Sequence, residues 1–311
     1  MRVLVTGGAG FIGSHLVPAL LASGHEVAVV DDLSTGALTN LDSRASFFEL
    51  DVNDDALSEV FNESRPEAVV MLAFNTNVPK SVDDPVFDSR SLTGSVRTLE
   101  LCRRHGARRV VFASSSFVYG EASLIPTPES SPTVAANPYV ITKSATEQYA
   151  RFYQAAYGLE PVIFRLATTY GPRQRGGAMA DYIRSIHAGG SAKIYGDGGK
   201  TRDYIYVADV VDAMLAAIRF EFSGSEQGDV VLNLGTGHET TLLDLYKRIG
   251  TLLGNPNAEA DFEADRPGEI MRTSLDASLA GDLLRWEPRV DLDDGLAETV
   301  GYFVTNSPAA E

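Results

Sequence analysis

Two short stretches carry the side chains best suited to chemistry. Residues 113–121 read ASSSFVYGE, so three serine hydroxyls follow an apolar run. Residues 137–150 read NPYVITKSATEQYA and place Tyr139 and Lys143 four positions apart, on one face of a predicted helix. A free phenol has a pKa of about 10, and an adjacent ammonium favours the phenolate. Lowering that pKa to about 7 corresponds to roughly 4 kcal/mol and makes the phenolate available as a base.

A Tyr/Lys pair on a helix is more often a surface or core-edge feature, so its surroundings decide its meaning. Residues 6–16 read TGGAGFIGSHL and contain both GxxGxxG and GxGxxG, formed by Gly7, Gly8, Gly10 and Gly13. Such glycines allow a tight turn and let a pyrophosphate rest on the N-terminus of the next helix. Asp31, eighteen residues beyond Gly13, is placed to bind a ribose 2′-hydroxyl and to repel a 2′-phosphate. The pattern favours NAD over NADP, although such loops also serve as plain turns.

The elements that must position these residues alternate between apolar runs and helical patterns. The runs are near-continuous, as in strands that are covered on both faces, and they span 2–7, 26–31, 45–51, 68–73, 108–114 and 160–166. Helical patterns lie between them and include 12–23, 54–63, 86–105 and 138–157. Repeated strand–helix units predict an α/β fold with a Rossmann-type, doubly wound parallel sheet.

The pattern becomes irregular beyond residue 170, with Gly- and Pro-rich pieces such as YGPRQRGGA and YGDGGKTRD. Residues 205–218 and 230–235 are typical of a helix and a strand that return to the main sheet. We therefore expect a cofactor domain of residues 1–170, joined by 203–235, and a smaller substrate domain of 171–202 and 236–311.

Composition narrows the function classes. A net charge of −16 should repel nucleic acid and anionic membranes, and no run approaches the ~20 apolar residues of a membrane helix. The basic cluster of Arg103, Arg104, Arg108 and Arg109 surrounds a predicted helix end, where cations complement the dipole. The scattered histidines and single Cys102 predict no metal site and no internal disulfide. A strand at the N-terminus predicts no signal peptide, and hence a cytoplasmic protein.

Several further motifs, taken together, are far more specific than any one of them. They are DDLSTG, SSSFVYGE, PYVITK, YGPRQ, GDGGKTRDYIYVADV, NLGTG, RPGE and the late Trp286/Pro288 segment. With the glycine loop, they make the chain resemble the extended short-chain dehydrogenases/reductases, and among these the nucleotide-sugar epimerases and dehydratases. The resemblance implies that Ser115 joins Tyr139 and Lys143 as the third catalytic residue.

The resemblance also implies a cofactor site and a substrate site. The NAD-binding positions are Gly7, Gly10, Phe11, Ile12, Gly13, Asp31, Asp32, Ser34, Asp51, Val52, Leu72, Ala73, Ser91, Ser114, Tyr139 and Lys143. The substrate positions are Ser115, Ser116, Thr168, Tyr195, Arg202, Tyr204, Arg266 and Thr273. Arg202 and Arg266 match arginines that grip the nucleotide diphosphate, a role that suits a guanidinium fork. Tyr195 and Tyr204 match nucleotide contacts, with loop packing as the alternative.

The chain departs from the family pattern around the cofactor and the sugar. Met71, Phe74, Ser91 and Thr168 stand where the family often has His, a small residue, Asn and a diphosphate-binding Asn. Ser116 and Phe117 replace the Asp-Glu pair of the 4,6-dehydratases. Thr273 replaces a bulky side chain that excludes an N-acetyl group, which favours a UDP-N-acetylhexosamine.

The implied reaction begins with oxidation of a UDP-sugar at C4, and three outcomes remain open. The first is 4-epimerisation of a UDP-hexose or UDP-N-acetylhexosamine. The second is the loss of water from UDP-N-acetylglucosamine to give a 5,6-alkene, as in the dehydratase of the tunicamycin pathway. The third is a non-catalytic regulator that binds NAD and a UDP-sugar. The family also implies a homodimer through helices 86–105 and 138–157.

Overall fold

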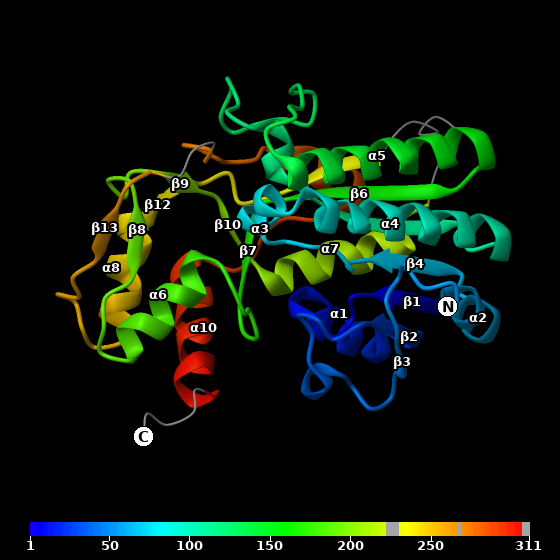
Figure 1. Ribbon diagram of the computed structural model, residues 1–311, viewed down its shortest axis with the longest axis horizontal. Coiled ribbons are helices and arrows are strands. Elements are labelled where there is room, and N and C mark those ends of the chain that lie inside the picture. The colour runs from blue at the N-terminus through cyan, green and yellow to red at the C-terminus, as the bar shows by residue number, and fades with distance from the viewer. Residues whose placement is uncertain (222–229, 266–268, 307–311) are drawn as a thin grey trace.

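A seven-stranded parallel sheet forms the centre of the protein in the computed structural model, which describes residues 1–221, 230–265 and 269–306 (Figure 1). Its strand order is β11-β6-β5-β4-β1-β2-β3. The strands are β1 (Arg2–Thr6), β2 (Glu26–Asp31), β3 (Ser46–Glu49), β4 (Ala68–Met71), β5 (Arg109–Ser115), β6 (Glu160–Leu166) and β11 (Val230–Leu234). This order confirms the predicted doubly wound sheet, and it changes direction between β1 and β4.

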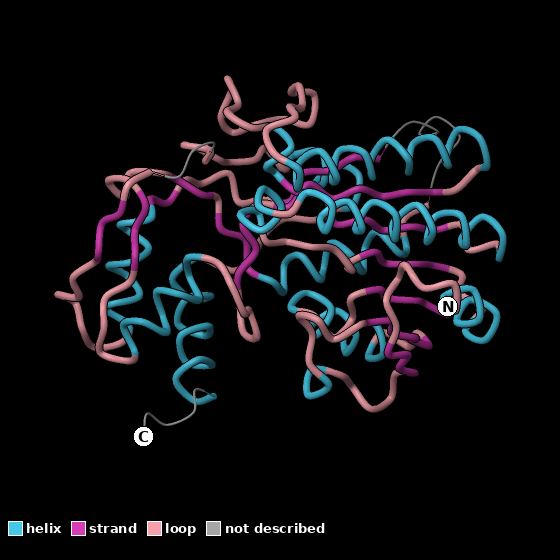
Figure 2. Tube along the Cα trace, in the orientation of Figure 1, coloured by secondary structure: helices cyan, strands magenta, loops and turns pink. Residues whose placement is uncertain are grey.

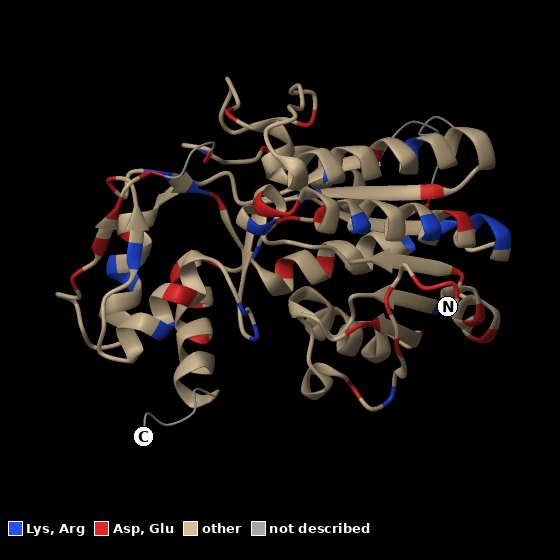
Figure 3. Ribbon diagram, in the orientation of Figure 1, with Lys and Arg blue, Asp and Glu red and all other residues tan. Residues whose placement is uncertain are grey.

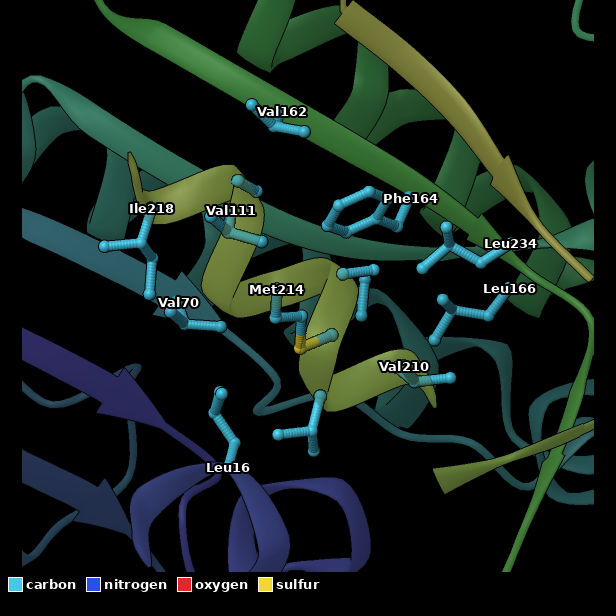
Figure 4. Packing of buried hydrophobic residues seen from close by; sticks show 14 of the residues in the cluster. Leu16, Val70, Val111, Val162, Phe164, Leu166, Val210, Met214, Ile218 and Leu234 are labelled. Atoms are coloured by element: carbon cyan, nitrogen blue, oxygen red, sulfur yellow. The ribbon is translucent and has the colours of Figure 1, made fainter. Parts of the chain in front are cut away.

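Helices cover both faces of the sheet, which explains why its strands are apolar throughout. On one face, α1 (Phe11–Ala22) and α7 (Val207–Arg219) bury side chains against the strands, and Figure 4 shows Met214 of α7 facing Val70 and Phe164. On the other face lie α2 (Leu57–Ser64), α4 (Pro85–His105) and α5 (Pro138–Tyr157). Burial on both faces removes apolar surface from water, which stabilises the fold by about 25 cal/mol for each Å² buried.

The two long helices begin and end at residues that the local sequence specifies. Asn137 caps α5 by accepting a hydrogen bond from the N–H of Val140, and Asp84 caps α4 by accepting one from Phe87. A proline follows each cap, and each helix ends at a glycine with positive φ, Gly158 or Gly106. Because α5 has this defined start, Tyr139 lies in its first turn.

The remaining elements form small sheets and a separate apolar cluster. The two-stranded sheets pair β10 (Tyr204–Tyr206) with β7 (Thr168–Tyr170), β12 (Thr240–Thr241) with β9 (Thr201–Arg202), and β13 (Asp261–Glu263) with β8 (Lys193–Tyr195). The third hydrophobic cluster is built largely from α6 (Ala178–His187), α8 (Leu242–Leu252) and α10 (Leu292–Asn306), which group at one end of the molecule in Figure 2. The short helices are α3 (Val78–Asp83), α9 (Ser278–Leu284), η1 (Leu38–Asn40) and η2 (Ser116–Tyr119).

The region around residue 205 corrects one expectation and confirms another. Residues 204–206 form β10 rather than the start of a helix, because they pair with β7 in parallel register, and α7 begins at Val207. Strand β11 returns to the main sheet beside β6, as the sequence predicts. The exact division into two domains stays a prediction.

The four arginines of the basic cluster are all held by carboxylates. Arg103 and Arg104, in the last turn of α4, pair with Glu100, whereas Arg108 and Arg109 pair with Glu160. Each of these arginines therefore has an acidic partner within the chain. Figure 3 shows basic and acidic positions close together at this end of α4. Within the described ranges, no helix is both long and apolar enough to cross a membrane.

Candidate active site

The glycine loop lies where the strand order reverses, between the carboxyl ends of β1 and β4. Gly7 has a φ of +74°, and a Cβ at this position would stand 2.6 Å from the amide nitrogen of Ala73. A side chain there would collide with backbone, so only glycine allows the two loops to approach this closely. Leu72 donates its N–H to Thr6 at 2.9 Å, which fixes the second loop against the first. In open α/β sheets, this crevice is the usual place for a ligand.

The loop leads directly into α1, whose N-terminus faces the crevice. A Cβ on Gly13 would stand 2.5 Å from the carbonyl oxygen of Gly7, and one on Gly10 would stand 3.1 Å from the same atom. Gly10 caps the helix without a side-chain hydrogen bond, and α1, described in full, has no acidic residue in its first turn. The N–H groups that begin with Phe11 and Ile12 are therefore suited to a pyrophosphate.

Asp31 ends β2 beside this loop and is buried. Its carboxylate accepts N–H groups from Ala9 at 2.9 Å and Leu33 at 2.8 Å. Burial raises the pKa of Asp31, while these two hydrogen bonds act in the opposite direction. The exposed Asp32 accepts the backbone N–H and the hydroxyl of Ser34, so the two acids of this turn have different surroundings.

The other predicted cofactor positions lie at the ends of the neighbouring strands. Asp51 and Val52 follow β3, and Arg90 of α4 pairs with Asp51 at 2.5 Å. Burial acts against ionisation, but hydrogen bonds from Asn53 and Arg90 lower the pKa of Asp51. Ser91 accepts the N–H of Asn75 at 3.0 Å and so holds the loop after β4. These predicted NAD positions therefore lie at or beside the carboxyl ends of neighbouring strands of the sheet.

Ser115 and Tyr139 meet at the end of β5. The Ser115 hydroxyl is close enough to the phenol to act on its pKa, and Ser115 Oγ accepts the N–H of Phe117 at 3.2 Å. Burial raises the pKa of Tyr139 to about 12, and the Ser115 hydroxyl offsets this rise only in part. The lowered phenol pKa expected from the sequence is therefore absent from this arrangement. The reason is the position of Lys143, which lies 5.9 Å from the centre of the Tyr139 ring.

Lys143 is buried on the same face of α5. Its Nζ donates to the carbonyl oxygen of Ala113 at 2.6 Å and lies 3.5 Å from the centre of the Phe74 ring, within cation–π range. Burial lowers the pKa of Lys143 to about 7, although the charges of Glu147 and Asp88 act to raise it. Phe74 also packs edge-on against Tyr139, with ring centroids 6.2 Å apart.

A buried ionic pair that no sequence motif indicated supports the face of α5 that carries Tyr139 and Lys143. Glu147, one turn beyond Lys143, accepts hydrogen bonds from Arg165 at 2.7 Å and from the hydroxyl of Ser114 at 2.5 Å. The side chains of Glu147 and Arg165 are 2% and 4% exposed, so water does not screen the pair. Ser114, predicted as a cofactor contact, thus joins β5 to α5.

Arg202 brings the second part of the chain to the segment that follows β5. Its guanidinium lies 5.8 Å from the ring of Phe117 and donates to the carbonyls of Thr201 and Ile270. Phe117 follows the buried Ser116 in η2, one residue beyond Ser115. Burial lowers the pKa of Arg202. A half-buried guanidinium of this kind suits a diphosphate.

The remaining substrate positions differ in their surroundings. Tyr204 is buried in the third hydrophobic cluster and edge-on to Tyr170, which favours packing over nucleotide contact. Thr168 of β7 is half-buried and pairs with Tyr204 of β10 in the two-stranded sheet. Tyr195 ends β8, and Thr273 is buried in the segment that precedes Leu275. Arg266 lies outside the described residues.

Comparison with known proteins agrees with this geometry. The NAD dependent epimerase/dehydratase family model matches residues 3–235. A UDP-glucose 4-epimerase of Mycolicibacterium smegmatis is 41% identical over 99% of this chain and 100% of its own length. A dTDP-glucose 4,6-dehydratase of Actinoplanes is 33% identical, with 98% of each chain covered.

A solved relative has the same overall structure. The crystal structure of the Thermotoga maritima UDP-glucose 4-epimerase with UDP-glucose is 38% identical, has a TM-score of 0.93 and covers 98% of this chain and 99% of its own. Similarity of this extent, together with the glycine loop and the Ser115–Tyr139 contact, identifies the chain as an enzyme. It belongs to the NAD dependent epimerase/dehydratase family.

Proposed function

We propose that the protein is a UDP-sugar 4-epimerase in which Ser115, Tyr139 and Lys143 catalyse a reversible oxidation at C4. The observation that carries this proposal is the approach of the Ser115 hydroxyl to the Tyr139 phenol, beside a buried lysine, at the carboxyl ends of the strands where the glycine loop lies. These are the groups needed to move one proton between a sugar hydroxyl and the protein.

Each residue has a definite role. Tyr139 takes the proton of the C4 hydroxyl and later returns it, while Ser115 donates a hydrogen bond to the reacting oxygen. The chemistry that NAD⁺ supplies when bound is reversible acceptance of the C4 hydride. The loops that contain Gly7, Gly13 and Asp31 would hold it.

The pKa of Tyr139, at about 12, has to fall before the phenol can serve as a base near neutral pH. An approach of the Lys143 ammonium supplies the required positive charge. Lys143 has to leave the carbonyl of Ala113 to make this approach, and its side chain is long enough to reach the phenol from the same helix face. The buried setting strengthens the interaction between the two groups.

Epimerisation requires only that the C4 ketone rotate in the site, so that hydride returns to its opposite face. Elimination requires a further acid and base near C5 and C6, and the two residues after Ser115 are Ser116 and Phe117, which are neither. This favours epimerisation. Formation of a 5,6-alkene and binding without turnover remain as outcomes of the test.

The substrate proposed is a UDP-hexose or UDP-N-acetylhexosamine, with Arg202 on the diphosphate. Thr273 is small enough to leave room for an N-acetyl group. The purified protein should be incubated separately with UDP-glucose and UDP-N-acetylglucosamine, and each product analysed by mass spectrometry and proton NMR. An unchanged mass with an inverted C4 proton coupling supports epimerisation. Loss of one water indicates the dehydratase, and an unchanged sugar despite tight binding indicates a regulator.

We further propose a cytoplasmic homodimer that pairs α4 and α5 with their copies. Ile141, Tyr149 and Phe152 support this assembly, because they are 50%, 42% and 53% exposed and recur at helical spacing on α5. Exposed apolar stripes of this kind mark interaction surfaces.

A further inference from the structure

Asp88 is a buried carboxylate whose side chain faces the catalytic helix. It lies in the first turn of α4 and is 0% exposed. Thr142 of α5 donates its hydroxyl to one carboxylate oxygen at 2.8 Å, and the side-chain amide of Asn75 donates to the other at 3.0 Å. Asp88 thus joins a helix to the loop that follows β4.

Both partners of Asp88 adjoin the proposed active site. Thr142 immediately precedes Lys143 and stands one turn after Tyr139. Asn75 follows Phe74, whose ring lies beneath the Lys143 ammonium, in the loop that begins with Leu72. Asn75 is also held through its backbone N–H by Ser91. Asp88 therefore links α5, which carries Tyr139 and Lys143, to the loop that contains Leu72 and Ala73.

A role limited to holding α4 in place does not require this charge. An ionised carboxylate is costly to bury away from water unless other groups compensate its charge. The two hydrogen-bond donors of Asp88, Thr142 and Asn75, are neutral. The negative charge of Asp88 acts to raise the pKa of Lys143 and so favours its ammonium form. The same charge acts to raise the pKa of Tyr139 and so opposes its phenolate form. Glu147 of α5 is the second carboxylate that faces Lys143.

We propose that Asp88 is a positioning residue of the active site, which joins Thr142 to Asn75 and supplies a buried counter-charge to Lys143. The proposal rests on the proposed function, because it assumes that Tyr139 and Lys143 carry out the chemistry. In this proposal, Asp88 sets the distance between Tyr139 and Lys143 on one side and the loop of Leu72 and Ala73 on the other.

The test compares Asp88→Asn with the exchanged pair N75D/D88N. The single variant keeps the size of the side chain but sets one amide against the amide of Asn75, while the exchange restores a complementary donor and acceptor. Asp209→Asn is the control, because Asp209 is an equally buried carboxylate that accepts N–H groups from Arg289 and Val290, away from the site.

We expect Asp88→Asn to lower kcat by about tenfold to a hundredfold with KM unchanged, because a hydrogen bond to a charged group near the reacting atoms is lost. The exchanged pair should recover most of that loss, and Asp209→Asn should leave kcat intact. The acid limb of the kcat profile should also move to lower pH in Asp88→Asn, because the Tyr139 phenolate forms more easily without a neighbouring negative charge. Ser115, which also acts on the phenol, is unchanged in this variant, and so are Lys143 and its second carboxylate neighbour Glu147.

An unchanged kcat in folded Asp88→Asn would overturn the proposal. So would an equal loss in the single and exchanged variants with an unmoved acid limb, since that pattern indicates a structural role alone. NAD⁺ affinity, measured by calorimetry without substrate, separates this proposal from the proposed function. If the unchanged protein converts no UDP-sugar, the proposed function has failed. Weaker NAD⁺ binding by Asp88→Asn, restored in the exchanged pair, would then still support the link to the loop, and equal binding would refute it.

Discussion

The phenol of Tyr139 lies beside the hydroxyl of Ser115, although one residue lies on a helix and the other ends a strand. The two side chains meet because α5, which begins at Pro138, packs against β5 and η2. A parallel strand thus presents its last hydroxyl to the first turn of a helix. This arrangement gives a sugar hydroxyl two partners, one that accepts its proton and one that donates to its oxygen.

Removing the phenol oxygen should abolish most of the activity without unfolding the protein. Tyr139→Phe keeps the ring that packs against Phe74, and it loses only the group that accepts the proton. We expect kcat to fall by about 10²–10⁴, with NAD⁺ affinity measured by calorimetry nearly unchanged. Full turnover by this variant, with bound cofactor, would contradict the assigned role. Ser115→Ala should cause a smaller loss of kcat, because it removes a hydrogen bond rather than the base.

A single methyl group at Gly13 should disturb the cofactor loop. Its Cβ would stand 2.5 Å from the carbonyl oxygen of Gly7, so the backbone must shift. We expect Gly13→Ala to lower the free energy of unfolding by about 1–3 kcal/mol and to weaken NAD⁺ binding. Gly301→Ala on α10 is the matched control, since a Cβ at this position would have no neighbouring atom within 4 Å. The control should be neutral or up to about 1 kcal/mol more stable. Equal effects of the two changes would argue against a tight loop.

The fold could be predicted from sequence because its signals are local. Each strand of the central sheet is a short apolar run, and α4 and α5 are marked by a cap, a proline and a terminal glycine. The error at residues 205–206 arose because an apolar segment is compatible with both strand and helix. Pairing with β7, which is a tertiary contact, decides the outcome there.

The site could be predicted only where residue type and position both carry information. Tyr139, Lys143 and the glycines occur in recognisable spacings, whereas Asp88 stands in a polar helix start that resembles an exposed first turn. Its burial depends on Thr142 and Asn75, which lie far from it in sequence. The position of Lys143 was likewise missed, because the ring of Phe74 and the carbonyl of Ala113 compete with Tyr139 for its ammonium.

A charge on the exposed stripe of α5 should prevent the proposed dimer. Phe152 is 53% exposed, and the dimer would bury it beside its copy. Phe152→Glu would place two like charges in an apolar contact, so we expect a monomer in sedimentation velocity at micromolar concentration. Phe262→Glu, at a 56% exposed position on β13, should sediment like the unchanged protein. A monomeric unchanged protein would exclude the assembly itself.

The buried ammonium of Lys143 should make stability depend on pH in a defined direction. Burial lowers the pKa of Lys143 to about 7, against about 10.4 in the unfolded chain. Between these values the unfolded chain binds one proton more than the folded protein, so the free energy of unfolding rises with pH. The gain is about 1.4 kcal/mol for each pH unit in this window.

Lys143→Met removes the group that binds this proton. The unfolding free energy of the unchanged protein should therefore rise relative to that of the variant between about pH 7.5 and about pH 9.5. The measurement is urea denaturation across this range, and Lys247→Met provides an exposed-lysine control. The window ends below about pH 10, because the unfolded lysine loses its own proton at about pH 10.4 and the difference then stops growing. A constant difference over the window would mean that Lys143 keeps its charge in the folded protein. The interaction with Asp88 and Glu147 would then outweigh burial.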